Sequence, residues 1–274
     1  MGREQISAVL AIDAAWTATE PSGVALVVST GFGWRCVAVA PSYDAFVGLA
    51  AGLPVTWTGA FSGRVPHVEL LLSAAQRLAA APVGLVTIAM PIATVPISKR
   101  RAGDNAVSKV FGGRACAAHT PNSIRPGPLG ARLSQDLVAA GFPIATTVTV
   151  AAAPRHLVEV YPHPALLSLL SRDYRIPYKV SKARRYWPSA PRTQRIHSLL
   201  EEFGTIRDAL SAGFGPLGVP LPVPANVRTL AELKRYEDAL DALVCAWVGV
   251  QYLGGATVPL GDDTAAIWCP RNVC

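Results

Sequence analysis

Short apolar runs separated by turns predict β-strands in the first third of the chain. The first run is almost continuously apolar, which is typical of a strand covered on both faces of a sheet, and it ends on Asp13. The second and third runs follow through short connections, so we expect three antiparallel strands. A helical pattern then precedes the fourth run and favours a parallel return beside the first strand. The four predicted strands comprise residues 6–13, 24–28, 34–39 and 83–90.

Helical periodicity dominates the rest of the chain. Helices are predicted over 67–81, 129–140, 162–170 and 193–203, and further strands over 156–161 and 265–269. The last long helix has a defined start, because Thr229 and Glu232 have the spacing of a capping box, and it continues to Trp247. The stretches 41–66 and 204–226 show no clear periodicity. The pattern predicts an α/β fold with a mixed sheet, in a single domain over residues 1–274.

The cysteines and the apolar segments indicate a cytoplasmic protein that does not enter a membrane. Five cysteines are scattered without a C-x-x-C pair, which is typical of a reducing compartment. Charged residues at positions 3, 4 and 13 interrupt the N-terminal segment, so we expect no signal peptide. The uncharged stretch 242–261 is broken by a glycine pair and by Pro259, which predicts a buried helix followed by a turn.

Positive charge is concentrated in two windows, and the net charge of the chain is +7. Residues 99–132 hold seven lysines and arginines against one acid, residues 172–195 hold eight against one, and the remaining residues hold ten against sixteen. Clustered cations bind polyanions because phosphate contacts release counterions. We therefore expect nucleic acid as the partner, bound by basic loop insertions at about 91–128 and 172–192; solvated loops that keep an apolar protein dissolved are the alternative. The candidate contacts are Lys99, Arg100, Arg101, Lys109, Lys182, Arg184 and Arg185.

Four carboxylates are notable because their neighbours are apolar. Asp13 ends the first strand, and Glu159 lies between two valines of the fifth. Asp238 and Asp241 share one face of the last helix. Carboxylates that converge at one sheet edge repel one another unless divalent cations hold them, and Mg²⁺ or Mn²⁺ suits such ligands. Two ions of this kind activate water in phosphodiester hydrolysis. The alternatives are a turn-capping role for Asp13 and solvent exposure for Glu159 and Asp238.

Four short motifs follow one another along the chain. They are Ala11-Ile12-Asp13-Ala14-Ala15-Trp16, Val158-Glu159-Val160-Tyr161-Pro162-His163-Pro164, Asp238-Ala239-Leu240-Asp241-Ala242-Leu243 and Ile267-Trp268-Cys269-Pro270. In order and spacing they resemble the domain-of-unknown-function 429 (DUF429) family, whose members are regarded as predicted nucleases of the RNase H-like fold. The resemblance implies a five-stranded mixed sheet in the order 3-2-1-4-5, with flanking helices and a long C-terminal helix. It also implies a metal site at the ends of strands one and four. We expect Asp13 and Asp241 to hold the metal ions there, Glu159 to complete the ligand set or position water, and Asp238 to assist.

Position 89 departs from this resemblance. The family usually has an Asp where the fourth strand ends, in a pattern like Ile-Asp-x-Pro-Ile, and this chain has Ile88-Ala89-Met90-Pro91-Ile92. An alanine side chain cannot bind a metal or accept a proton, so the second ion of a two-metal site is expected to be weakly held. The chain is either a natural variant with weak or no catalysis or a chain altered at this position.

Three functions are compatible with these features. The leading hypothesis is a metal-dependent nuclease of the RNase H-like superfamily, inactive or weakened by Ala89. The second is a non-catalytic nucleic-acid-binding protein on the same scaffold. The third is an ATP-dependent phosphotransferase of the actin and sugar-kinase type, which needs a glycine-rich phosphate loop after the first strand. The segment 13–17 contains no glycine, so this hypothesis ranks last.

Overall fold

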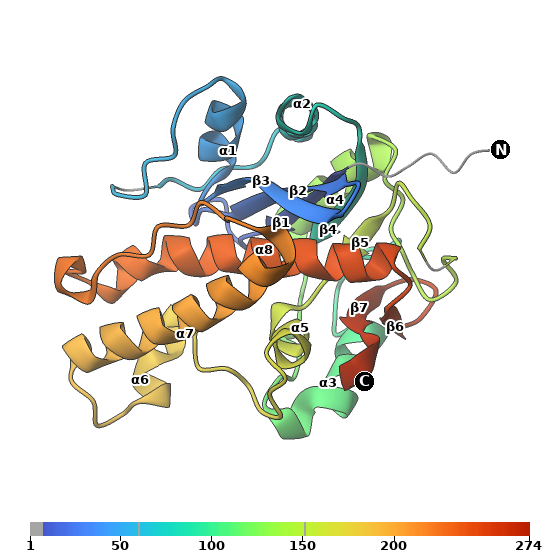
Figure 1. Ribbon diagram of the computed structural model, residues 1–274. Coiled ribbons are helices and arrows are strands. Elements are labelled where there is room, and N and C mark those ends of the chain that lie inside the picture. Colours follow the sequence, from blue (N-terminus) through green and yellow to red (C-terminus); the bar gives the residue numbers. More distant parts are fainter. Residues whose placement is uncertain (1–7, 60, 151) are drawn as a thin grey trace.

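A seven-stranded mixed sheet forms the centre of the computed structural model, which describes residues 8–59, 61–150 and 152–274 (Figure 1). In chain order the strands are β1 (Ala8–Asp13), β2 (Gly23–Thr30), β3 (Gly33–Ala40), β4 (Val83–Ile88), β5 (Leu157–Glu159), β6 (Thr257–Gly261) and β7 (Ala266–Pro270). They lie in the order β3-β2-β1-β4-β5-β7-β6. Ile6 and Ser7 of the first predicted strand lie outside the described residues.

The first five strands have the order that the family resemblance implies, but the sheet has seven strands, where the resemblance implied five and the sequence pattern predicted six. β1, β2 and β3 are antiparallel neighbours, β4 returns parallel to β1, and β5 and β7 continue the parallel part. β7 confirms the strand expected at the C-terminal end. β6 pairs antiparallel with β7 where the sequence predicted only a turn. Pro259 and Gly261 weaken the strand signal of β6, and an edge strand tolerates proline because its outer side has no ladder to complete.

Helices cover both faces of the sheet (Figure 1). They are α1 (Tyr43–Ala50), α2 (Val68–Ala79), α3 (Ala102–Phe111), α4 (Gly127–Ala139), α5 (Pro162–Leu169), α6 (Ala183–Tyr186), α7 (Arg192–Phe214) and α8 (Lys234–Leu253). Side chains of α1, α2 and α4 form one hydrophobic cluster with the sheet, and side chains of α3, α5, α7 and α8 form the other. None of the helices in the described part of the chain is long and apolar enough to cross a membrane.

Four helices differ from the sequence prediction. Helices α3 and α6 lie inside the stretches 91–128 and 172–192, which were predicted as basic loop insertions. Helix α1 lies in the stretch that was expected to be irregular, and the Ser42 side chain caps it by accepting a hydrogen bond from the Ala45 amide. Helix α7 continues eleven residues beyond position 203, because Ile206, Leu210 and Phe214 extend its buried stripe. The capping box at Thr229 is confirmed, although it opens a short 3₁₀ turn that leads into α8.

Helix α8 lies unusually close to the centre of the sheet. A side chain at Gly249 would meet Val9 and Thr87 at 2.8 Å from its Cβ position, and one at Gly23 would meet the Asp238 carbonyl oxygen at 2.0 Å. Gly23 is also the pairing partner of Asp13 at the end of β1. The absence of side chains at these glycines therefore lets α8 approach the sheet, with Asp238 close to the end of the first strand.

Candidate functional site

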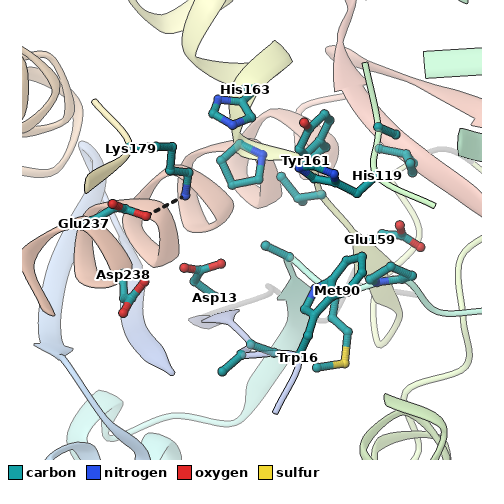
Figure 2. A pocket seen from close by; sticks show the side chains of 18 of the residues that line it. Asp13, Trp16, Met90, His119, Glu159, Tyr161, His163, Lys179, Glu237 and Asp238 are labelled. Atoms are coloured by element: carbon teal, nitrogen blue, oxygen red, sulfur yellow. Dashed lines mark ion pairs between the residues drawn. The ribbon is translucent and has the colours of Figure 1, made fainter. Parts of the chain in front are cut away.

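A pocket of about 670 Å³ opens at the carboxyl-terminal ends of β1, β4 and β5. This edge is where open α/β sheets bind their ligands. Four of the predicted catalytic positions line it, namely Asp13, Ala89, Glu159 and Asp238. The fifth, Asp241, is completely buried one turn further along α8 and does not line the pocket. Figure 2 shows Asp13 and Asp238 near Glu237 and Lys179, and Glu159 further across the pocket.

Asp13 and Ala89 are neighbours, as the predicted strand order requires. The Ala89 amide donates to the Ile12 carbonyl at 2.8 Å, and Ile12 pairs with Ile88. Side chains alternate along a strand, and Val9 and Ala11 pack into the cluster beneath α8, so the Asp13 carboxylate also faces α8. The same alternation puts Ala89 on that face, and its methyl group packs against the same cluster.

Six charged residues lie together where α8 meets the end of β1, and we call them the open cluster because some of their oxygens have no partner. They are Asp13, Lys179, Lys234, Glu237, Asp238 and Asp241. Lys179 Nζ lies 3.1 Å from Glu237 Oε1 and also pairs with Asp241. Lys234 Nζ lies 3.3 Å from the same Glu237 oxygen and also pairs with Asp238. Burial opposes the charge on Lys179, but Asp241 and Glu237 outweigh it and raise the pKa of Lys179 well above its ordinary value.

The carboxylates at the base of this cluster are held by further hydrogen bonds. The Tyr178 hydroxyl donates to Asp241 Oδ1 at 2.6 Å, and the Val180 amide donates to Glu237 Oε2 at 2.6 Å. Both oxygens of each carboxylate therefore have a donor within the protein. In this arrangement Asp241 supports the site from beneath, and its assignment as a metal ligand stays a prediction.

Asp13 and Asp238 keep free oxygens. Asp13 is partly exposed, and its carboxylate makes no hydrogen bond or ion pair with the residues that the structure describes. Asp238 Oδ2 is buried and has no partner in the same part of the chain. Burial, then the charge of Asp241, raises the pKa of Asp13 well above its ordinary value, and burial raises the pKa of Asp238 to about 7.

The residues present fit one hydrated divalent ion better than two. Mg²⁺ is commonly held by one or two carboxylates and completed by water and substrate phosphate, which matches the free oxygens of Asp13 and Asp238. Lys179 neutralises Asp241 and Glu237, and Ala89 adds no ligand. Within residues 8–59, 61–150 and 152–274, no three histidine, cysteine or acidic side chains are grouped as a preformed metal site.

Glu159 belongs to a second group of buried charges, the closed triad of Arg101, Asp104 and Glu159. Arg101 donates to the two oxygens of Glu159 at 2.6 and 2.7 Å and to Asp104 Oδ1 at 2.7 Å. The Ile92 amide also donates to Glu159, at 3.0 Å. Glu159 pairs with Ile88, whose side chain packs on the sheet face away from α8, so Glu159 points away from the Asp13 face. Glu159 was predicted to be a metal ligand, but both of its carboxylate oxygens already accept hydrogen bonds from the protein.

The predicted nucleic-acid contacts separate into buried and exposed groups. Arg101 is 9% exposed and uses its donors within the closed triad. Arg100 donates to Asn105 Oδ1 at 2.7 Å and to Thr120 Oγ1 at 2.8 Å, which ties the loop before α4 to α3. The exposed predicted contacts are Lys99, Lys109, Lys182, Arg184 and Arg185. Lys182 alone among these seven positions combines exposure with a place in the pocket wall.

Several pocket residues escaped the sequence analysis, although part of the signal was present. Lys234, Glu237, Asp238 and Asp241 stand at i, i+3, i+4 and i+7, so one face of α8 carries a charged stripe immediately before an uncharged, buried run. That pattern identifies Glu237 and Lys234 together with the two aspartates. Lys179 gives no such signal, because its pairing with α8 spans about sixty residues of sequence.

Comparison with known proteins gives one match. Residues 12–266 match the model of a family described as a protein of unknown function, DUF429. The match covers most of the chain and includes the open cluster, the closed triad and Ala89. No curated protein and no solved structure matches the chain significantly.

Proposed function

We propose that this chain, which belongs to the DUF429 family, is a metal-dependent nuclease scaffold whose catalysis is limited by Ala89. One observation carries the proposal: Asp13 and Asp238 line a pocket that cations also line, and both carboxylates keep oxygens without a hydrogen-bond partner among the described residues. Acids that hold a divalent ion, together with cations that bind the flanking phosphates, are the requirements of phosphodiester hydrolysis. The substrate is accordingly nucleic acid, and the ion is Mg²⁺ or Mn²⁺.

Each part of the site has a defined task in this proposal. Asp13 and Asp238 hold the ion, which when bound supplies Lewis acidity and lowers the pKa of a water molecule. Lys179 neutralises Glu237 and Asp241, so these buried carboxylates support α8 without repelling one another. Glu159 holds Arg101 and the Ile92 amide, which fixes the segment after β4 beside the pocket.

Ala89 occupies the position from which a third carboxylate would reach the ion. It follows β4 directly, faces α8 and lies beside Asp13. An aspartate there would add oxygens to a pair that already has free acceptors. A centre with more carboxylate ligands holds divalent ions more tightly because it offsets more of their charge.

The test compares Ala89→Asp with this chain and with Ala89→Asn, which has the same shape without the charge. Mn²⁺ binding is measured by calorimetry, and cleavage is screened with Mn²⁺ and with Mg²⁺ on single-stranded, duplex, hybrid and branched substrates. We expect Ala89→Asp alone to bind Mn²⁺ more tightly and to raise cleavage by orders of magnitude. Adding Asp13→Asn should abolish the gain. If Ala89→Asp remains as inactive as the parent chain on every substrate, the nuclease proposal fails.

A non-catalytic nucleic-acid-binding protein is the second candidate. It is favoured by Lys179, whose ammonium group supplies the charge that a second ion would bring to Asp241 and Glu237. In that case nucleic acid binds equally well with and without divalent ions, and Ala89→Asp changes neither affinity nor cleavage. Binding measured in EDTA and in Mg²⁺ distinguishes the two candidates.

A further inference from the structure

One wall of the pocket is cationic. Arg125, Arg175 and Lys182 line it, and His119 lies among them. Burial and then the charges of Lys182 and Arg175 lower the pKa of His119, which places these cations around it. Lys182 is exposed, and its side chain pairs with no acid among the residues that the structure describes. Lys182 therefore adds to this wall a positive charge that no described acid pairs with, whereas Arg125 lies 4.0 Å from Glu20.

Two buried side-chain nitrogens in this wall have no partner in the described part of the chain. His163 is 5% exposed and lines the pocket, and its Nδ1 atom makes no hydrogen bond. Its ring is held edge-on between Tyr161 and Tyr178, with ring centres 5.3 and 5.5 Å away. Arg175 has an unpartnered buried Nε, while its guanidinium donates to the Ala115 carbonyl at 3.2 Å. Buried polar atoms are normally hydrogen-bonded, so both indicate a group that enters from the pocket.

Trp16 supplies an aromatic surface across the pocket. Figure 2 shows its indole beside Met90, with Tyr161, His163 and His119 on the far side. The Trp16 ring is partly exposed and stacks on no other ring of the described residues. A free aromatic face binds nucleobases without sequence preference, because every base has a π-face.

The depth of the acids restricts what can reach them. Asp238 is 3% exposed and lines a pocket of about 670 Å³. A volume of this size suits a small molecule or a single nucleotide, not a double helix. A phosphate next to Asp13 and Asp238 therefore has to arrive on a strand whose nucleotide is unpaired.

We propose that the pocket binds one unpaired nucleotide, whose phosphate is held by His163, Arg175 and Lys182 and whose base stacks on Trp16. The inference rests on the proposed nuclease function and names its substrate class: single strands and strand ends. The phosphate recognised by these donors flanks the one that Asp13 and Asp238 approach. Arg184 and Arg185, which lie outside the pocket, contribute only diffuse attraction.

Binding without metal tests this site separately from catalysis. A short fluorescein-labelled oligothymidylate, single-stranded or in a blunt duplex, is titrated in EDTA and followed by fluorescence anisotropy. Lys182→Ala is matched by Arg184→Ala, an exposed cation outside the pocket, and Trp16→Ala is matched by Phe32→Ala, a fully exposed ring at the β2–β3 turn. We expect Trp16→Ala and Lys182→Ala each to weaken single-strand binding about tenfold, and the controls to change it less than about twofold.

Two additional variants keep the test decisive. Trp16→Phe retains a ring and should recover most of the affinity lost in Trp16→Ala, even if the alanine variant is poorly folded. His163→Phe keeps the aromatic packing but removes the free nitrogen, so it should weaken binding of the single strand with little change in the melting temperature. The blunt duplex should bind more weakly than the single strand and be insensitive to Trp16.

The site is refuted if the pocket variants and their controls weaken binding equally, or if the duplex binds as tightly as the single strand and depends equally on Trp16. These results do not decide the nuclease proposal, which is judged by Ala89→Asp cleavage. Pocket-dependent binding combined with an inactive Ala89→Asp would retain the nucleotide site and remove the nuclease. If Ala89→Asp cleaves nucleic acid but the Trp16 and Lys182 variants bind it normally, the nuclease proposal is retained and the nucleotide site is excluded.

Discussion

The closed triad and the open cluster place buried carboxylates beside cations in opposite ways. In the closed triad every oxygen of Glu159 accepts a hydrogen bond, and Arg101 spans both acids with a planar fork of donors. In the open cluster three carboxylates share two lysines, and the whole Asp13 carboxylate and one oxygen of Asp238 remain without partners in the described chain. Both groups border the same pocket, although they face opposite sides of the sheet.

The difference indicates which acids stabilise the fold and which are available for chemistry. A buried acid whose hydrogen bonds are complete has nothing left to offer a ligand. A buried acid with a free oxygen is costly to maintain, and the free oxygens of Asp13 and Asp238 distinguish these acids from Glu159, because burial raises the pKa of Glu159 as well. Glu159 is therefore a structural residue in this comparison, whereas Asp13 and Asp238 are candidates for function.

The largest expected effect comes from breaking the closed triad. Arg101→Met removes the side-chain cation that pairs with Glu159 and leaves it and Asp104 buried together, so the free energy of unfolding should fall by about 3–5 kcal/mol. Urea denaturation at neutral pH measures this. The exposed Arg184→Met serves as the control and should change stability by less than about 0.5 kcal/mol. A similar stability for both variants would remove the structural role assigned to the triad.

Lys179→Met tests whether divalent ions can replace the lysine in the open cluster, which we do not expect for the arginine of the closed triad. Without metal, Asp241 and Glu237 lose their shared cation, and we expect a loss of about 2–3 kcal/mol, reduced because Lys179 is 20% exposed. Mn²⁺ or Mg²⁺ should restore part of the melting temperature, because the released carboxylates join Asp13 and Asp238 as ligands. The same ions should not rescue Arg101→Met. Rescue of both variants, or of neither, would contradict the distinction between the two groups.

The pH dependence of the free energy of unfolding should reveal the raised pKa of Asp238. Its pKa is about 7 in the folded protein and about 3.9 in an unfolded chain, so the folded state binds more protons between these values. The favourable contribution of Asp238 to the free energy of unfolding is fully present below about pH 4 and is lost as the pH rises through about 7. Asp238→Asn should flatten that decline by about 1–2 kcal/mol between pH 5 and 8 in urea titrations. An unchanged slope would mean that Lys234 fully compensates the carboxylate.

The smallest effect on stability is expected at the exposed cations of the second basic window. Replacing Lys182, Arg184 and Arg185 together by Glu should change the free energy of unfolding by less than about 0.5 kcal/mol for each residue, because their side chains are solvated. Nucleic-acid affinity should fall, and its dependence on salt should become weaker. Binding titrations at several salt concentrations measure both. Unchanged affinity would exclude this window from the interface.

The sequence predicted the central part of the fold because its signals are local. Continuous apolar runs identified β1 and β4, and the spacing of Thr229 and Glu232 identified the start of the last helix. The pairing of Arg101 with Glu159 was not predictable, because a contact across 58 positions leaves no periodic trace. The direction of Glu159 depends on the register of a three-residue strand, where a shift of one residue exchanges the two faces of the sheet.

The contact between Gly23 and the main chain of Asp238 has a consequence for the evolution and the engineering of this scaffold. A Cβ atom at position 23 would lie 2.0 Å from the Asp238 carbonyl oxygen, so even alanine would push α8 away from the sheet. Because Gly23 pairs with Asp13, this contact between two main chains fixes the distance between Asp13 and Asp238. Substitutions in the pocket can alter its chemistry freely, whereas any side chain at position 23 changes the distance at which that chemistry occurs.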